Sequence, residues 1–232
     1  MVLAAPDDLR KARRMDGGST SRRSAPGARA RRGPREPGVA PTRAALHEAA
    51  LAYLARGAAT ADSVKKTLER RIANWVRRSV RAGRDAEGVA SDAATARELV
   101  PEIVARLREV GLVNDSSFAE NRAKRLSSAG RSRRAITAHL AHKGVDAATV
   151  REAVPHDAGA ELGAALAFAR KRRIGPFVSE EDMPEGRDAR REAERKALGT
   201  MARAGFDWNV CDRVMRMTRE DADERLRERR EF

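Results

Sequence analysis

The chain has 232 residues, of which 35% are charged and only 3% are aromatic, so any hydrophobic core must be built from Leu, Val, Ile and Ala. The formal net charge of +14 favours a polyanionic partner, such as nucleic acid or an acidic protein surface, unless it reflects only a generally basic composition. The single cysteine, Cys211, excludes an intramolecular disulfide, and no apolar run approaches the roughly 18 residues that a membrane span needs.

A core without aromatic bulk is thin, which favours an elongated array of small helical modules over one large globule. Each short helix buries only a narrow apolar stripe and needs a neighbour to cover it. The expected fold class is therefore all-α, a tandem array of three-helix units. A secretory apolar segment is also missing, so we expect a cytoplasmic protein without membrane contact.

Residues 1–43 form an arginine-rich segment with almost no large apolar side chain. Such a segment buries too little surface to offset the entropy of ordering, so we expect a disordered tail. Its function is left open by the sequence. It either raises affinity for a phosphate backbone or is a solvated extension, and a natural start nearer Met15 is a third alternative.

Residues 44–111 have the apolar periodicity of a first three-helix unit. We expect helices at about residues 44–57, 60–83 and 92–110, with a loop at 83–91 before the last. Pro101 lies inside the third helix, and because proline removes an amide donor and clashes with the preceding turn, it predicts a kink or a fresh helix start there.

Residues 112–156 form the second unit, around which the rest of the chain is organised. Glycines at 111, 130 and 144 each precede a short polar side chain, which is the order of signals that ends one helix and begins the next. The residues expected to cap the three helices are Asn114 or Asp115, Ser132, and Asp146.

Residues 157–218 form the third unit, with a helix from about Asp157, a loop rich in Gly and Pro, and helices from about 187 to 203 and from 207 to 218. The last residues, 219–232, alternate Arg with Asp and Glu and are expected to be a charged tail, as a solvated helix or a frayed end. An internal repeat supports the division, because four positions of the second unit recur at the same spacing in the third. The pairs are Leu140 and Met201, Gly144 and Gly205, Asp146 and Asp207, and Val154 and Met215.

No residue pattern of the sequence predicts catalysis. His139 and His142 are three apart but lack a third ligand at metal-binding spacing, and solvated helix histidines are the more common interpretation. Cys211 falls on the inner stripe of its helix, where a small buried hydrophobic residue is usual. We therefore expect no enzyme activity, no metal and no cofactor.

The sharpest functional feature is a basic surface centred on the second unit. Arginines crowd the start of the helix that follows Gly130, where exposed backbone amides would add positive potential. The alternative is charge that only keeps a small helical unit soluble. The candidate contact residues are Lys124, Arg125, Arg131, Arg133, Arg134, Lys143, Arg170, Lys171, Arg172 and Arg173.

The second unit resembles the RecX family of regulatory proteins. Two runs of residues carry the resemblance: Gly111, Leu112, Asn114, Asp115, Phe118 and Ala119, and then Ile136, Leu140, Lys143, Gly144, Val145 and Asp146. The likeness covers roughly residues 44–218. It departs from the family pattern at Ser132 and Arg133, where a Gly-Pro pair is frequent in the family.

The resemblance implies a regulator of the RecA recombinase in DNA repair, recombination and the SOS response. Such a protein is a curved array of three-helix units that lodges in the groove of the RecA filament on DNA and restrains its activity. The expected partners are RecA and, as an open question, single- or double-stranded DNA, and the protein is expected to be a monomer. Capping of filament ends remains an alternative to binding along the groove. The alternative function is a stand-alone nucleic-acid-binding protein that acts through its basic face.

Overall fold

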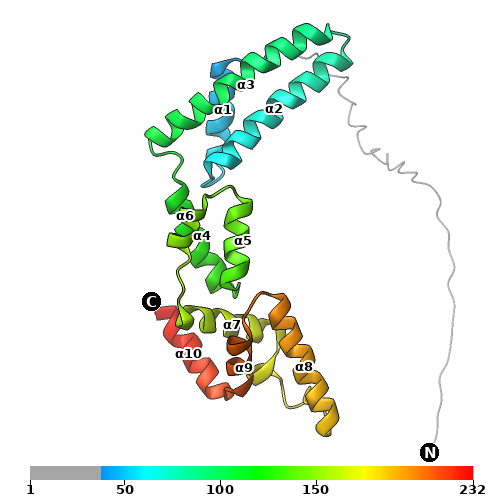
Figure 1. The fold of residues 1–232 in the computed structure, drawn as a ribbon, viewed down its shortest axis with the longest axis vertical. Helices are drawn as coiled ribbons and strands as arrows, with labels where there is room; N and C mark the ends of the chain where they lie inside the picture. The colour runs from blue at the N-terminus through cyan, green and yellow to red at the C-terminus, as the bar shows by residue number, and fades with distance from the viewer. Residues whose placement is uncertain (1–37, 232) are drawn as a thin grey trace, which may run out of the picture. The chain divides into compact units, whose positions relative to one another are not determined.

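The computed structural model describes residues 38–231, which are entirely helical in their regular structure (Figure 1). The predicted all-α class is therefore confirmed. The described residues all belong to one compact unit, residues 36–232. The expected disorder of residues 1–43 falls mainly on residues 1–37, which lie outside the described range.

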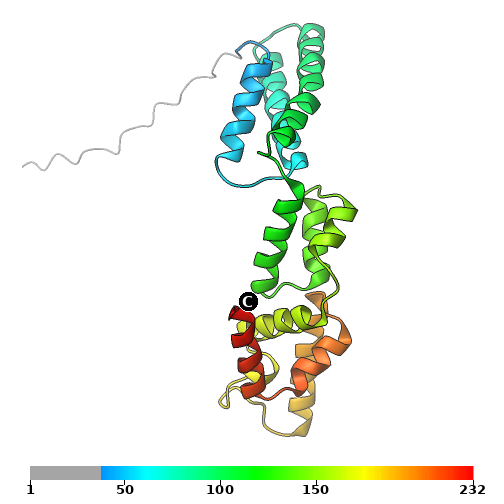
Figure 2. The same ribbon diagram turned by 90° about the vertical axis from the view of Figure 1, so that its left-hand side faces the viewer.

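The first group of helices consists of α1 (Arg43–Leu54), α2 (Ala61–Arg81) and α3 (Ala86–Glu109). Figure 2 shows α1 in blue running beside the other two, and all three helices share one cluster of buried side chains. The fully buried members are Leu46, Ala50, Val64, Leu68, Ile72 and Leu107.

The predicted loop at residues 83–91 is wrong, because α3 begins at Ala86. The side chain of Asp85 accepts a hydrogen bond of 2.7 Å from the amide of Gly88, which is the cap that starts the helix. Val89 and Ala93 are already buried in the core of this group. The helix also continues through Pro101, so proline causes no fresh start.

The second group consists of α4 (Asp115–Ser128), α5 (Arg133–His142) and α6 (Ala147–Ala153). The predicted caps are confirmed: the side chains of Asn114, Ser132 and Asp146 each accept hydrogen bonds from amides of the helix that follows. The cluster of buried side chains that they enclose is small, and its members are Ala119, Ala123, Ile136, Leu140, Val145 and Val150.

The third group consists of α7 (Ala158–Arg172), the 3-10 turn η1 (Gly175–Phe177), α8 (Arg187–Arg203), α9 (Trp208–Arg216) and α10 (Arg219–Glu231). The expectation of a charged tail at 219–232 needs correction, because α10 packs on the core. Ala222 is 0% and Leu226 is 5% exposed, and both belong to the cluster of α7 and α9. Asp207 precedes α9 as predicted, but its side chain makes no capping hydrogen bond.

The first and second groups are joined by two hydrogen bonds at the start of α2. The hydroxyl of Thr60 donates to the carbonyl of Lys143, at the end of α5, over 2.6 Å. The amide of Ala61 donates to the carboxylate of Asp115, in the first turn of α4, over 2.9 Å. Thr60 is fully buried, so this contact is screened from water.

The same arrangement recurs one group further along the chain. The hydroxyl of Ser132 donates to the carbonyl of Ala204, at the end of α8, over 2.7 Å, and the amide of Arg133 donates to Glu161 of α7 over 2.9 Å. In both places a helix start meets the end of a helix that stops at a glycine with positive φ. The structural repeat therefore includes the contact between neighbouring groups as well as the helices.

Candidate functional site

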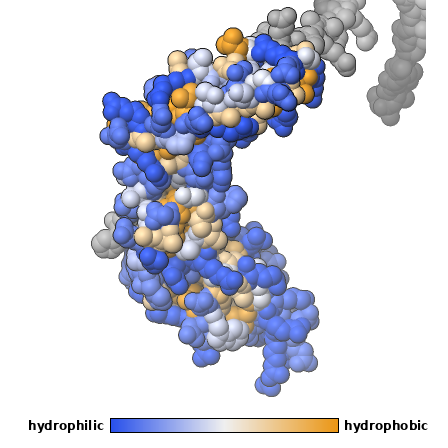
Figure 3. Space-filling model, turned by 45° about the horizontal axis from the view of Figure 1, so that its top comes forward, coloured by the Kyte–Doolittle hydropathy of each residue, from blue (hydrophilic) through white to orange (hydrophobic). Residues whose placement is uncertain are grey.

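The start of α5 holds the arginines that the sequence singles out. Arg131, Arg133 and Arg134 are exposed, and Figure 3 shows hydrophilic residues over most of the face in view. Two backbone amides of this helix start are occupied: Ser132 accepts from Ala135 over 3.2 Å, and Glu161 accepts from Arg133. The expectation that exposed amides add positive potential here needs correction at these two positions, because the chain supplies their acceptors itself.

Glu161 is the carboxylate that fills this position, and it is half-buried. Burial raises its pKa, while the hydrogen bond from the Arg133 amide and the positive charge of Arg133 lower it. Nearby Asp207 raises the pKa further, and the net direction is upward. The exposed positive charge at this helix start is therefore carried by the guanidinium side chains of Arg131, Arg133 and Arg134.

The basic run at the end of α7 is partly engaged by the chain itself. The ammonium of Lys171 donates to the carbonyl of Ala129 over 2.9 Å and so caps the end of α4. The guanidinium of Arg172 lies 5.8 Å from the centre of the Phe168 ring. Arg173 adopts a left-handed backbone conformation, with φ of 54°, and ends α7.

The remaining predicted cations differ in their surroundings. Lys124, Arg125 and Arg170 are exposed, whereas Lys143 is half-buried beside α2. Arg125 lines a hollow of about 460 Å³ together with Gly111 and other residues at the start of α4. The start of α5 and the end of α7 thus both lie at the contact between the second and third groups of helices. Lys143 lies at the contact between the first and second groups.

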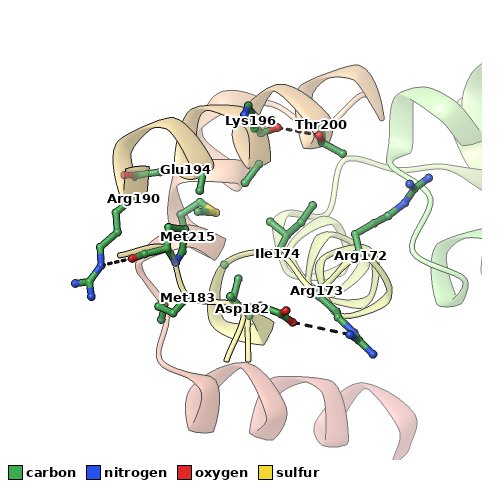
Figure 4. Close-up of a pocket in the computed structure, with 15 residues that line it drawn as sticks. Arg172, Arg173, Ile174, Asp182, Met183, Arg190, Glu194, Lys196, Thr200 and Met215 are labelled. Atoms are coloured by element: carbon green, nitrogen blue, oxygen red, sulfur yellow. Dashed lines mark hydrogen bonds and ion pairs between the residues drawn. The ribbon is translucent and has the colours of Figure 1, made fainter. Parts of the chain in front are cut away.

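A hollow of about 770 Å³ lies between α7, η1, α8 and α9. Figure 4 shows Ile174 and Met215 toward its interior and Arg190 at its rim, where Arg190 donates to the carbonyl of Pro184 over 3.0 Å. Arg173 points outward and lies 3.9 Å from Asp182. The hollow combines an apolar floor with a charged rim.

His139 and Cys211, the side chains considered for metal binding and catalysis, lie in ordinary structural surroundings. His139 accepts a hydrogen bond of 3.0 Å from Arg122, and burial together with the charge of Arg122 lowers its pKa. Burial also raises the pKa of Cys211, which keeps the thiol protonated. Within residues 38–231 no group of three or more His, Cys, Asp or Glu side chains is arranged to hold a metal ion. No helix of that range is both long and apolar enough to cross a membrane.

A second basic surface lies outside the candidate contact residues that were predicted from the sequence. It is a groove of about 680 Å³ on α1 and α2, and the signal for it was an arginine face on α2 that repeats at helical spacing without acidic residues between. Its six arginines are Arg56, Arg70, Arg71, Arg77, Arg78 and Arg81.

These features define a class: a strongly basic, all-helical protein whose described helices pack around three hydrophobic clusters and carry groups of exposed arginines. A family model described as the second three-helix domain of RecX matches residues 114–154, the span of α4 to α6. Regulatory protein RecX of Myxococcus xanthus (strain DK1622) is 35% identical over 197 residues, which cover 83% of this chain and 95% of that protein.

Two further relatives carry the same name. Regulatory protein RecX of Mycolicibacterium vanbaalenii is 36% identical over 144 residues, or 59% of this chain and 75% of that protein. The protein of Agrobacterium fabrum is 33% identical over 114 residues, or 49% of this chain and 57% of that protein. The chain belongs to the RecX family of regulatory proteins, which confirms the resemblance seen in its sequence.

Proposed function

We propose that this protein regulates the RecA recombinase by binding the RecA filament on DNA and restraining its ATP hydrolysis and strand exchange. The observation that carries the proposal is the similarity to a regulatory protein RecX over 83% of the chain. The match to the second three-helix domain falls on the helices that carry the basic corner, here defined as Arg131, Arg133 and Arg134. The protein acts by binding and not by catalysis.

The proposed contact uses the corner's side chains together with Arg125 and Lys143. A filament of protein on DNA presents phosphates and acidic side chains, to which guanidinium groups bind with two parallel hydrogen bonds. The corner's own carboxylate, Glu161, is directed to a backbone amide and leaves the guanidiniums for an external partner. We propose that the array lies along the filament groove rather than at its end.

The direct test adds the purified protein to RecA on single-stranded DNA and follows ATP hydrolysis and strand exchange. Both rates should fall, and no change at concentrations equal to that of RecA would refute the proposal. Titration separates the two modes of binding, since capping needs only a few molecules per filament, whereas binding along the groove needs an amount proportional to RecA.

A triple variant tests the basic corner. Arg131→Ala, Arg133→Ala and Arg134→Ala together should weaken inhibition without loss of helical content, because all three side chains are exposed. The matched control removes three exposed cations of the first group, Lys65, Lys66 and Arg97. If the triple variant and the control inhibit equally, the corner is not part of the contact surface.

Salt distinguishes this function from simple nucleic-acid binding. If about six phosphate contacts dominate, affinity for bare DNA falls on the order of a thousandfold between roughly 50 and 200 mM salt. Binding to RecA filaments that persists where binding to bare DNA is lost supports a protein contact. Equal loss of both would favour the stand-alone nucleic-acid-binding alternative.

A further inference from the structure

The groove on α1 and α2 concentrates positive charge without a counterion from the described chain. Its lining contains the six arginines named above, and the remaining residues are small or neutral: Ala49, Ala52, Thr67 and Asn74. No carboxylate lines the groove within residues 38–231. This arginine groove is separate from the basic corner, which lies at the start of α5.

The acidic residues of α2 are paired outside the groove. Asp62 lies 2.7 Å from the ammonium of Lys66, and Glu69 lies 3.9 Å from that of Lys65. None of the six arginines forms an ion pair with a described residue. Two of them bond to a neutral neighbour instead: Arg77 donates to the side chain of Asn74, and Arg78 donates to its carbonyl over 3.3 Å.

Such an arrangement is unfavourable for an isolated helix. Arg77 and Arg81 are four residues apart, a spacing at which like charges repel. The exposed guanidiniums are planar forks, which suit phosphate oxygens better than the single charge of lysine does. A bound row of phosphates would relieve the repulsion, which an uncharged or cationic partner would not.

The spacing of the arginines fits the repeat of a nucleic-acid backbone. From Arg70 to Arg81 the helix rises about 16 Å at 1.5 Å per residue. A B-form strand places a phosphate about every 3.4 Å along its axis, so this length spans about five phosphates of one strand. The arginine face is held on a rigid helix, which favours an equally rigid row of ligands.

The groove lacks the groups that recognise unpaired bases. Proteins that bind single strands combine a basic groove with aromatic side chains on which the bases stack. The described lining contains no aromatic residue, and the nearby Tyr53 ring is covered by the guanidinium of Arg56 at 5.4 Å. Recognition by phosphate contacts alone positions a protein on DNA without reading its sequence.

We propose that the arginine groove binds the phosphate backbone of duplex DNA independently of sequence. The site would hold the first group of helices on DNA, whereas the basic corner serves the regulatory contact. It goes beyond the proposed regulation of RecA and does not depend on it, so it is tested with DNA alone.

The test measures binding of a mixed-sequence duplex oligonucleotide by the full chain over a range of salt, using fluorescence anisotropy. The variant carries Arg70→Ala, Arg71→Ala, Arg77→Ala and Arg78→Ala. A matched control removes four cations of the same group of helices, on α2 and α3, that do not line the groove: Lys65, Lys66, Arg97 and Arg106.

Each lost phosphate contact should reduce the slope of log affinity against log salt by about 0.9, so the variant's slope falls by about 3 to 4. Between roughly 50 and 200 mM salt, the wild type should then lose on the order of a hundredfold more affinity than the variant does. In the control, the slope should change by less than the value of about 0.9 that is expected for one phosphate contact. Equal slopes in variant and control would overturn the proposal, as would loss of single-strand binding alone.

A second measurement locates the DNA and stands even if the fourfold variant folds poorly. Cysteine is placed at Ala52, an exposed residue of the groove, or at Ala94, an exposed residue of α3 outside it, and is labelled with a photo-crosslinker. The native Cys211 is 1% exposed and should not react. Crosslinking of the duplex from position 52 and not from 94 supports the groove, and equal crosslinking from both refutes it.

Discussion

Replacement of Ser132 by Ala should destabilise the protein, because the hydroxyl of Ser132 takes part in two hydrogen bonds. The hydroxyl oxygen accepts a hydrogen bond from the amide of Ala135, which caps α5, and its proton is donated to the carbonyl of Ala204. The residue is 0% exposed, so water does not replace either partner without rearrangement. The substitution removes a helix cap and a contact between groups at once.

The expected cost follows from the two losses. Removing an N-cap hydroxyl costs about 1 kcal/mol. Leaving the Ala204 carbonyl without its donor costs about 1 kcal/mol more, the usual net value of a hydrogen bond in a folded protein. The free energy of unfolding should therefore fall by about 2 kcal/mol, as measured by urea titration with circular dichroism at constant slope.

The neighbouring Gly205 makes the prediction sharper. Its φ is +92°, and a Cβ there would lie 2.7 Å from the hydroxyl oxygen of Ser132. Gly205→Ala should be destabilising alone, but less so in a protein that already carries Ser132→Ala, because the clashing atom is gone and only the backbone strain remains. The double-mutant cycle should show a coupling of at least about 0.5 kcal/mol.

The control is Thr137→Ala on the exposed face of α5, which should leave stability nearly unchanged. A cost of less than about 0.5 kcal/mol for Ser132→Ala, well below the sum of a cap and a hydrogen bond, would show that the hydroxyl does not serve both partners. Simply additive effects of Ser132→Ala and Gly205→Ala would show that the two residues are not in contact.

Three further predictions concern other buried or crowded positions. Gly144→Ala should cost at least about 1–2 kcal/mol in urea unfolding, because a Cβ at its φ of +77° would lie 2.3 Å from Cβ of Asp62. Ser79→Ala should leave the urea midpoint unchanged or raise it, since the buried hydroxyl of Ser79 has no hydrogen-bond partner among the described residues, and a clear loss of stability would contradict this. Because burial raises the pKa of Glu161, the folded state binds that proton more tightly than the unfolded state. The wild type should therefore gain stability relative to Glu161→Gln as pH falls from neutral through the acidic range. The urea midpoints of both proteins are measured across this range, and a loss of relative stability toward low pH would contradict a raised pKa.

The helix boundaries of the second group could be predicted because their signals are local. A glycine follows each of α3, α4 and α5, and a polar side chain two or three residues later accepts the first amides of the next helix, so neither step requires distant residues. The same holds for α8, whose predicted bounds, 187 and 203, agree with the structure. The start of α3 at Ala86 was not predicted although Asp85 is also a local signal, because Gly88, three residues further on, suggests a loop.

The surroundings of the candidate site could not be predicted, because they depend on contacts between distant residues. Arg133 and Glu161 are 28 positions apart, and Lys171 and Ala129 are 42 apart, so no periodicity links them. The burial of Leu226 likewise depends on α7, since α10 alone reads as a solvated charged helix. Local sequence predicts where helices begin, whereas packing decides which of their charges remain available.

The two contacts between groups give a reason why the proposed binding surfaces consist of side chains and not of helix ends. At each contact a carboxylate from the following group accepts a bond from the first amide of a helix: Asp115 serves α2, and Glu161 serves α5. A buried hydroxyl beside it donates to the last carbonyl of a third helix. The positive end of each of these helices is thereby neutralised within the chain, so an external anion gains little from the helix dipole there. Arginines that project from the sides of helices, at the corner on α5 and in the groove on α2, are left as the groups through which this protein can bind a polyanion.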